Sequence, residues 1–305
     1  MSSDVVRVGI LGCGNVGGAL VQLISDHAAE IPRRSGLRLE VTRVAVRNMA
    51  RERGVELPDG VLTHDPQAVV DDPNVDVVVE VIGGIEPARG LILDALAHGK
   101  PVVTANKELL ANVGRDVFDA AEQAGVDLLF EASVAGGIPL IRPLRESLAG
   151  ERITRVMGIV NGTTNFILTQ MTEEGMSFAD ALAEAQSLGF AERDPTADVE
   201  GFDAASKASI IASLAFGARV VAGDVYREGI SAVTAADITA ARELGYVIKL
   251  LAIAEERDGA VAVRVHPTMV PAAHPLASVR GSFNAVFVEG EAVGDLMLYG
   301  RGAGG

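Results

Sequence analysis

Short apolar runs alternate with amphipathic stretches through the first part of the chain. The apolar runs are rich in Val and Ile and short enough for strands, and the stretches between them carry apolar residues at helical spacing. Strands that alternate with helices favour a parallel sheet with helices on both faces. We therefore expect an α/β fold in this part of the chain. The predicted strands are residues 5–11, 39–46, 75–82, 101–104 and 126–132.

A glycine-rich loop joins the first predicted strand to a helical pattern that runs from Gly18 to about His27. Glycine at such a place lets the backbone turn tightly, approach a pyrophosphate closely and pack helix against strand, while the helix N-terminus offers amide donors. The loop therefore predicts a Rossmann-type, doubly wound parallel sheet that binds a dinucleotide. The alternative is a tight structural turn without a ligand. The predicted cofactor contacts are Gly12, Gly14, Asn15, Val16 and Gly17.

The end of the second predicted strand bears on the choice of cofactor. The dinucleotide fingerprint expects Asp or Glu there to hold the ribose hydroxyls, but Arg47 stands in that place, with Arg51 and Arg53 nearby. Guanidinium groups suit the extra 2′-phosphate of NADP(H) better than the bare ribose of NAD(H). We expect NADP(H) to be preferred and NAD(H) to be possible. The alternative is a set of solvated surface arginines.

Polar residues also follow the predicted strand at 101–104. Ligands of doubly wound sheets bind at the carboxyl ends of the strands. Thr104, Asn106 and Lys107 are therefore expected to face the cofactor or the substrate. The alternative for Lys107 is an ordinary surface lysine.

The strict alternation of strand and helix stops near Pro139, which indicates a second domain of α+β type. We expect a dinucleotide-binding domain over residues 1–138 and a catalytic and dimerisation domain over residues 139–305. A hydrophobic sheet face in the second domain is weak support for dimerisation. The predicted strands of this domain are residues 153–160, 282–289, and the pair 246–255 and 260–266, which form a hairpin around Asp258-Gly259.

Two polar segments of the second domain are candidates for the substrate site. Residues 161–165 read Asn-Gly-Thr-Thr-Asn and form either a pocket wall or a helix N-cap cluster. Residues 185–207 pass through an acidic loop into an apolar helix, where Asp203 and Lys207 share one face at i, i+4 spacing. Each of the two side chains can fix the position and charge of the other, so Lys207 is a candidate acid or base. The carboxylates that can capture a substrate ammonium, or that simply form a solvated face, are Glu192, Asp194, Asp198 and Glu200.

Composition excludes several classes of function. Asp and Glu (41) outnumber Lys and Arg (26), so a net charge of −15 repels nucleic acids and anionic membranes, and we expect neither as a partner. The single cysteine, Cys13, excludes a disulfide framework and a cysteine zinc cluster and favours the cytoplasm. It lies under the predicted pyrophosphate site, which excludes thioester chemistry. The chemistry that remains is carbonyl and alcohol interconversion, with a lysine moving the proton.

Taken together, these motifs resemble the homoserine dehydrogenase family. The resemblance rests on the glycine loop, on residues 104–107, 131–139, 161–165 and 265–268, and above all on residues 185–207, which are highly specific to that family. It implies an NAD(P)H-dependent oxidoreductase that interconverts L-aspartate 4-semialdehyde and L-homoserine in the biosynthesis of threonine, methionine and isoleucine. It also implies a homodimer or a homotetramer.

The resemblance further implies roles for individual residues. Lys207 is the catalytic acid or base, Lys107 assists at the carbonyl oxygen, and Asp203 orients the substrate. It places Glu192 and Asp198 in the amino-acid pocket, so the substrate-binding residues that we expect are Glu192, Asp198, Asp203, Thr163 and Gly162. The residues that we expect in the cofactor site, besides the glycine loop and Arg47, are Thr104, Lys107 and Gly302. The residues that it assigns to a monovalent cation, typically sodium, are Glu131, Val134, Gly136 and Ile138.

The C-terminus departs from the family pattern. Family members continue beyond the glycine-rich stretch at 300–305 into a helix that returns to the dinucleotide domain, and many add a regulatory domain. We expect a chain that stops before both. Two alternatives to the family function stay open: another two-domain reductase of an amino-acid semialdehyde or imine, and a non-catalytic regulator that binds NAD(P)H.

Overall fold

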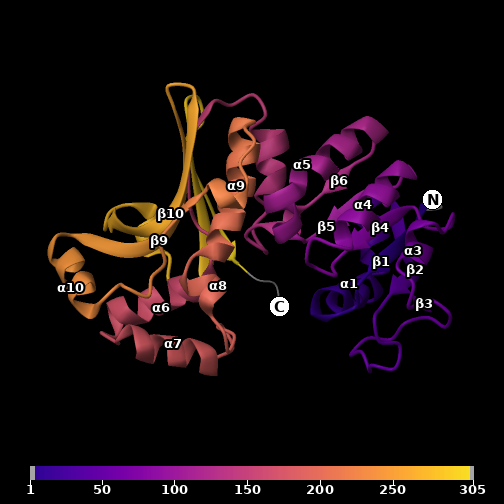
Figure 1. The fold of residues 1–305 in the computed structure, drawn as a ribbon, viewed down its shortest axis with the longest axis horizontal. Helices are drawn as coiled ribbons and strands as arrows, with labels where there is room; N and C mark the ends of the chain where they lie inside the picture. The colour runs from indigo at the N-terminus through magenta and orange to yellow at the C-terminus, as the bar shows by residue number, and fades with distance from the viewer. Residues whose placement is uncertain (1–3, 303–305) are drawn as a thin grey trace. The chain divides into compact units, whose positions relative to one another are not determined.

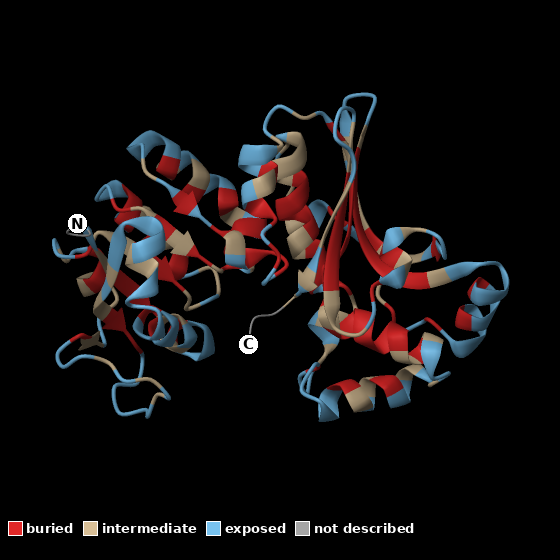
Figure 2. Ribbon diagram, turned by 180° about the vertical axis from the view of Figure 1, so that it is seen from behind, coloured by how far each residue is buried: buried red, intermediate tan, exposed pale blue. Residues whose placement is uncertain are grey.

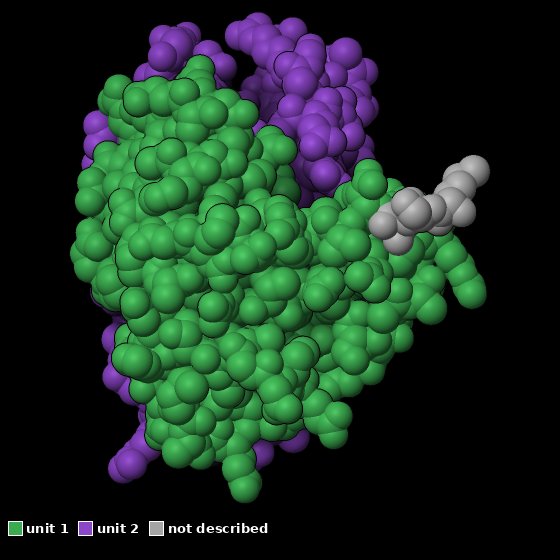
Figure 3. Space-filling view, turned by 90° about the vertical axis from the view of Figure 1, so that its right-hand side faces the viewer, with its two compact units in different colours: residues 1–130 green, residues 131–305 purple. Residues whose placement is uncertain are grey.

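The computed structural model describes residues 4–302. The chain divides into two compact units, unit 1 with Met1–Phe130 and unit 2 with Glu131–Gly305, which are coloured separately in Figure 3. Segment 131–138, which we expected in the first domain, is held within unit 2, where the Gly137 amide donates to the Arg301 carbonyl at 3.0 Å. Residues 1–3, and the part of the glycine-rich ending at 303–305, lie outside the described residues.

Unit 1 is built on one parallel sheet in the order β3-β2-β1-β4-β5-β6 (Figure 1). The chain winds outward from β1 on one side and then returns to its other side with β4, as in doubly wound dinucleotide-binding sheets. The predicted α/β fold with a Rossmann-type sheet is confirmed. The strands are β1 Asp4–Leu11, β2 Leu37–Ala45, β3 Leu62–Thr63, β4 Val77–Glu80, β5 Val102–Thr104 and β6 Leu128–Leu129. The helices are α1 Asn15–Asp26, α2 Glu30–Ser35, α3 Gln67–Val70, α4 Ala88–Ala97 and α5 Lys107–Ala124.

The core of unit 1 comes from the apolar runs that the sequence shows. One hydrophobic cluster joins Ile10 of β1, Val44 of β2 and Val79 of β4 to Val21 of α1, and buried residues line the strands in Figure 2. In the parallel register Leu11 lies opposite Glu80, which in turn lies opposite Thr104. The carboxyl ends of β1, β4 and β5 therefore meet at one edge of the sheet.

Unit 2 is an α+β unit whose sheet has the order β12-β11-β7-β9-β10-β8. The pairs are antiparallel except β10 with β8, and α9 packs against β7, β9 and β10. The strands are β7 Ile153–Ile159, β8 Tyr226–Arg227, β9 Tyr246–Arg257, β10 Ala260–Pro271, β11 Phe283–Gly290 and β12 Gly294–Arg301. The α-helices are α6 Gly162–Glu173, α7 Phe178–Ser187, α8 Thr196–Val199, α9 Phe202–Phe216 and α10 Ala235–Glu243. The 3-10 turns are η1 Glu131–Ser133, η3 Ala222–Asp224 and η4 Pro275–Ser278, and η2 Pro143–Ser147 is a π-helix.

The predicted hairpin of unit 2 is present as β9 and β10. The two turn residues, Asp258 and Gly259, have φ values of 51° and 77°. Positive φ at both central positions belongs to the tight hairpin turn whose twist matches the strands.

The limits of three elements have local causes. Residues 30–35 form α2, in which Pro32 lies in the first turn, where no helical N–H is needed. Helix α9 ends at Phe216, because Gly217 takes a left-handed conformation and caps it. The expected strand at 126–132 is reduced to the two residues of β6, because the chain turns into η1 at Glu131.

Candidate active site

The glycine loop of unit 1 has the geometry of a pyrophosphate cradle. Gly12 has a φ of +103°, and a Cβ there would lie 2.9 Å from the Val81 carbonyl oxygen. A Cβ on Gly17 would lie 2.1 Å from the Gly12 carbonyl oxygen, whereas one on Gly14, the N-cap of α1, would meet nothing within 4 Å. Two glycines therefore let the backbone turn and pack, and the third leaves the space at the helix N-terminus open for an anion. Asn15 and Val16 are exposed in the first turn of α1.

The segment after β2 carries the three arginines, and the charge of one of them, Arg53, acts on Cys13 in this loop. Arg47 is exposed, and Arg53 folds back so that its guanidinium donates to the carbonyls of Arg51 at 2.8 Å and Asn48 at 2.5 Å. Burial raises the pKa of the Cys13 thiol, and the positive charge of Arg53 opposes that rise. Arg53 thus contributes positive charge next to the glycine loop.

A buried carboxylate organises the edge of the unit 1 sheet. Glu80 is fully buried at the end of β4, and it accepts hydrogen bonds from the Ile82 and Gly83 amides and, at 2.6 Å, from the Thr104 hydroxyl. Thr104 is 1% exposed and its Oγ1 accepts from the Asn106 amide at 3.0 Å. Thr104 therefore braces this edge through its side chain.

Asn106 and Lys107 begin α5 at the same edge. Asn106 is the N-cap: its Oδ1 accepts from the Leu109 amide at 3.1 Å and its Nδ2 donates to the Gly84 carbonyl at 2.7 Å. Lys107 is the first residue of the helix and is half-buried. The strand-end position that we predicted for Thr104, Asn106 and Lys107 is observed, and their contacts with cofactor or substrate stay predictions.

The predicted Asp203–Lys207 pair is formed in unit 2. Lys207 Nζ donates to Asp203 Oδ2 and to the Val160 carbonyl, both at 2.7 Å, and the side chains are 13% and 8% exposed. An ammonium group has three donors, so two fixed partners leave a third for a substrate oxygen. The protein therefore fixes the orientation of both side chains of the pair.

Asn161 connects this pair to a further carboxylate. Its Nδ2 donates to Asp203 Oδ2 at 3.0 Å and to Asp198 Oδ1 at 2.7 Å. Its Oδ1 accepts from the amide and hydroxyl of Thr164, so the same side chain caps α6. We name Lys207, Asp203, Asn161 and Asp198 the Lys207 cluster. The sequence offered a pocket wall or an N-cap at residues 161–165, and Asn161 is both a cap and a member of the cluster.

The other predicted substrate residues surround α6 and the acidic loop. Thr163 donates its hydroxyl to the Phe190 carbonyl at 2.6 Å and so ties α6 to the start of the loop. A Cβ on Gly162 would lie 2.8 Å from the Ser282 carbonyl oxygen, so the residue must be glycine for segment 279–283 to approach. Glu192 is exposed in the acidic loop, and its main-chain carbonyl accepts from Gln186 Nε2. Direct substrate contacts of these residues stay predictions.

The segment proposed for a cation is a tight loop closed by Glu131. Glu131 Oε1 accepts from the amides of Leu140 and Ile141, and Oε2 accepts from the Arg142 amide at 3.0 Å. Within the loop, Val134 and Ile138 are buried, while Gly136 is exposed with a φ of 48°. An ionised carboxylate has about four acceptor sites, so Glu131 retains one after three amides. Glu131 can thus contribute one oxygen to a cation.

Gly302 lies against a buried amide. A Cβ on Gly302 would lie 2.3–2.4 Å from the amide atoms of Asn284, a fully buried residue of β11. Asn284 Nδ2 and Oδ1 lack a hydrogen-bond partner among residues 4–302. A contact of Gly302 with the cofactor stays a prediction.

The described residues contain neither a metal cluster nor a membrane-spanning helix. Within residues 4–302, no group of three or more His, Cys, Asp or Glu side chains is placed to hold a metal ion. No helix in this range is long and apolar enough to cross a membrane.

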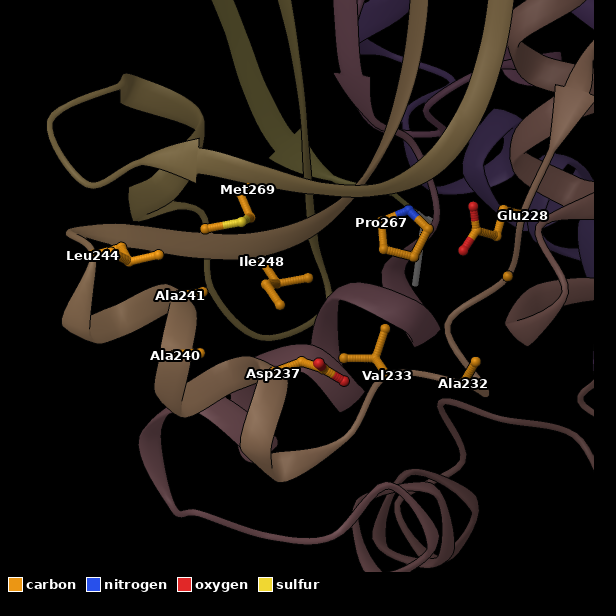
Figure 4. Close-up of a pocket in the computed structure, with 11 residues that line it drawn as sticks. Glu228, Ala232, Val233, Asp237, Ala240, Ala241, Leu244, Ile248, Pro267 and Met269 are labelled. Carbon is orange, nitrogen blue, oxygen red and sulfur yellow. The ribbon is translucent and has the colours of Figure 1, made fainter.

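A pocket of about 350 Å³ lies in unit 2 between α10, segment 228–233 and β10 (Figure 4). Its wall contains none of the predicted site residues, so we do not assign the reaction to it.

Comparison with known families gives matches to both units. A family model described as homoserine dehydrogenase matches residues 139–305, and one described as the NAD-binding domain of homoserine dehydrogenase matches residues 12–131. The chain is 56% identical to the homoserine dehydrogenase of Corynebacterium glutamicum over 99% of this chain and 69% of that protein. It is 50% identical to that of Bacillus subtilis over 98% of this chain and 69% of that protein.

Solved structures of similar proteins agree with these matches. A homoserine dehydrogenase crystal structure from Thiobacillus denitrificans superposes with a TM-score of 0.93 at 50% identity, covering 99% of this chain and 70% of that one. A hyperthermophilic archaeal homoserine dehydrogenase in complex with NADPH has a TM-score of 0.83 at 31% identity, covering 99% of this chain and 93% of that one.

Proposed function

The chain belongs to the homoserine dehydrogenase family, and we propose that its Lys207 cluster carries out the proton chemistry of the family reaction. The enzyme is an NAD(P)-dependent oxidoreductase that acts on a CH–OH group and interconverts L-aspartate 4-semialdehyde and L-homoserine, a step in the biosynthesis of threonine, methionine and isoleucine. The observation that carries the proposal is the buried Lys207–Asp203 pair with Asn161 and Asp198 around it.

The nicotinamide, when bound, supplies the hydride for the aldehyde carbon or accepts it from the alcohol carbon. Lys207 Nζ donates a proton to the developing alkoxide in reduction and accepts the hydroxyl proton in oxidation. Asp203 holds the lysine in place and stabilises its charge. Asp198, fixed by Asn161, attracts the substrate ammonium, together with the exposed Glu192. Thr163 and Gly162 fix the start of α6, next to Asn161.

Lys107 is proposed as a second cation at the carbonyl oxygen. Asn106 caps the helix that Lys107 begins, and the fully buried Glu80 braces the strand end before it through Thr104. Because these hydrogen bonds hold the start of the helix in place, Lys107 is suited to stabilise negative charge on the carbonyl oxygen. Replacement of Lys107 by Met is expected to lower kcat.

We propose that NADP(H) is the preferred cofactor. The open space at Gly14 fits the pyrophosphate, with Gly12, Gly17, Asn15 and Val16 around it. Arg47 and Arg53, in the segment that follows β2, are suited to the 2′-phosphate. Gly302 is proposed as a further contact with the cofactor.

The low cysteine content, with Cys13 as the single thiol, supports our inference of a cytoplasmic location.

We further propose a monovalent cation, typically sodium, on the loop closed by Glu131. The remaining acceptor site of its carboxylate and the main-chain carbonyls of Val134, Gly136 and Ile138 are the oxygen ligands that hard cations take. In a thermal-unfolding assay, sodium is expected to raise Tm relative to choline at equal ionic strength. Equal Tm values in the two salts would contradict the proposed site.

The test of the main proposal is turnover of L-homoserine with NADP and with NAD at mildly alkaline pH. We expect turnover with both cofactors and a higher kcat/KM with NADP. Lys207→Met is expected to lose at least about a thousandfold in kcat, at the middle of the range for a general acid or base, while NADPH binding measured by fluorescence is unchanged. A Lys207→Met variant with wild-type kcat would refute the assignment of the proton to Lys207.

A further inference from the structure

Lys249 is a buried cation that the proposed mechanism does not use. It lies in the apolar strand β9 and is 3% exposed. Its Nζ donates to the Asn165 side-chain oxygen at 2.9 Å and to the Val279 carbonyl at 2.5 Å. Both of these acceptors are uncharged. Burial lowers the pKa of Lys249 to about 8, against an opposing influence of Glu173, so the protein places a cation where its charge is costly.

Asn165, the partner of Lys249, joins α6 to the segment before β11. Its Nδ2 donates to the carbonyls of Gly281 at 2.9 Å and Phe283 at 3.1 Å. One turn further along α6, Thr169 Oγ1 accepts from the Gly281 amide at 3.2 Å. The same segment comes close to the first residue of α6, where glycine is required at position 162. Lys249 and Asn165 therefore fix one face of α6 to segment 279–283.

The N-terminus of the same helix carries the link to the Lys207 cluster. Asn161 is one turn before Asn165, and its Nδ2 holds the carboxylates of Asp198 and Asp203. A shift or rotation of α6 would therefore move Asn161 away from both carboxylates. Because hydrogen bonds lose strength steeply with distance and angle, a small displacement of the helix is enough to release them.

We propose that Lys249 is a positioning residue for substrate binding, which acts through Asn165 to hold α6 where Asn161 can fix Asp198 and Asp203. This inference rests on the proposed function, in which those carboxylates bind the substrate ammonium and orient Lys207. It gives the buried cation a purpose that packing alone does not, because an apolar side chain in its place would avoid the desolvation cost.

Lys100 provides a matched control in unit 1. It is 9% exposed, and its Nζ donates to the carbonyls of Val70 at 2.5 Å and Asp72 at 2.7 Å. Burial lowers its pKa as well. It precedes β5, at the strand end opposite to the one that carries Thr104. Lys100 is thus a second buried lysine bonded to carbonyls, without a link to α6.

The experiment compares Lys249→Met, Lys249→Gln and Lys100→Met with the wild type in the full chain, through KM for L-homoserine, KM for NADP, kcat and Tm. We expect Lys249→Met to raise KM for homoserine by roughly tenfold, as for the loss of a hydrogen bond to a charged group, with KM for NADP within about twofold of wild type. Lys249→Gln retains a hydrogen-bond donor, so its KM for homoserine is expected to lie between those of the wild type and Lys249→Met. Lys100→Met is expected to lower Tm and to leave KM for homoserine unchanged.

Two results would overturn the inference while leaving the proposed function intact. One is a folded Lys249→Met or Lys249→Gln variant with wild-type KM for homoserine. The other is that neither variant folds, which would make the role of Lys249 purely structural. A wild-type protein without homoserine turnover would instead overturn the proposed function, and this inference with it.

Discussion

Asn161 joins the start of a helix to two carboxylates with one side chain. Its oxygen caps α6 by accepting from the Thr164 amide at 2.9 Å, and its nitrogen donates to Asp198 and Asp203. The cap is a local interaction, whereas the bridge connects segments 37 and 42 residues apart. The two roles can therefore be separated by substitution.

The substitutions Asn161→Ser and Asn161→Ala separate the helix cap from the bridge to the two carboxylates. Serine is a good N-cap but is too short to reach the two carboxylates, so its variant is expected to keep the cap and to lose only the stability that comes from the two hydrogen bonds to Asp198 and Asp203. Alanine loses the cap as well and is expected to be about 1 kcal/mol less stable than the serine variant. Both variants should lose roughly tenfold or more in kcat/KM for homoserine, because both release the carboxylates. Steady-state kinetics of the two variants measure kcat/KM, and urea unfolding measures the free energy of unfolding.

The opposite pattern would refute this division of roles. If Asn161→Ser kept the wild-type kcat/KM, the bridge to Asp198 and Asp203 would have no part in substrate binding. Asn161 would then be only the helix cap that one interpretation of the sequence offered.

At the scale of elements, the glycine loop and α1 form a unit whose glycines have different tasks. Gly17 is buried and its Cα faces the Gly12 carbonyl, whereas Gly14 faces open space at the helix N-terminus. We expect Gly14→Ala to fold with a Tm near wild type and to weaken NADP binding, because the added methyl occupies the approach of the pyrophosphate.

Gly17→Ala is the matched substitution in the same loop. Its Cβ would be 2.1 Å from the Gly12 oxygen, so the backbone must move, and we expect a clear loss of Tm. Thermal unfolding with and without NADP distinguishes the two variants. A Gly14→Ala protein with wild-type NADP affinity would contradict the placement of the pyrophosphate.

The elements show where sequence patterns are sufficient and where they are not. The parallel sheet, the β9–β10 hairpin and the Asp203–Lys207 pair follow from local periodicity, so they could be predicted. The bridge from Asn161 to Asp198 could not, because it depends on how α6 and the acidic loop meet. Glu80 ends the apolar run of β4, and Lys249 is the single charge between Tyr246 and Ala254 in β9. A lone charge in or at the end of an apolar run is the signal that could have identified both as bonded, buried residues.

Strand β9 also carries a prediction about pH. Burial lowers the pKa of Lys249 from the 10.5 of an ordinary lysine to about 8 in the folded chain, while Glu173 raises it and Arg280 lowers it. Between these values the unfolded chain binds more protons than the folded one, so the unfolding free energy rises with pH. This contribution to the unfolding free energy is complete above pH 10.5, the ordinary pKa of lysine, and is lost as the pH falls through 8.

Denaturant unfolding of the wild type and of Lys249→Met from pH 7 to 9.5 measures this effect. The wild type is expected to gain stability relative to the variant above pH 8, with a slope of up to about 1.4 kcal/mol per pH unit. Stability curves that run parallel over the whole range would show that the ammonium is not desolvated in the folded chain.

At the scale of the whole molecule, the exposed tyrosines favour unit 2 as the surface through which we expect the chain to associate. The chain has three tyrosines and no tryptophan. All three tyrosines belong to the strands of the unit 2 sheet and are exposed: Tyr226 by 61%, Tyr246 by 37% and Tyr299 by 54%. Tyrosine is enriched at protein interfaces, so this distribution favours the homodimer or homotetramer that the family resemblance implies.

Charge should act against that association, because each copy carries a net charge of −15. Salt screens repulsion between like-charged copies, so we expect the dissociation constant to fall as salt rises from 20 to about 300 mM. Sedimentation velocity should then show at least twice the 31.6-kDa mass of the chain. Since tyrosine emission arises only from unit 2, quenching by acrylamide should weaken in step with association. Association without any change in quenching would place the interface away from the tyrosines, and a monomer at every salt concentration would refute the oligomer itself.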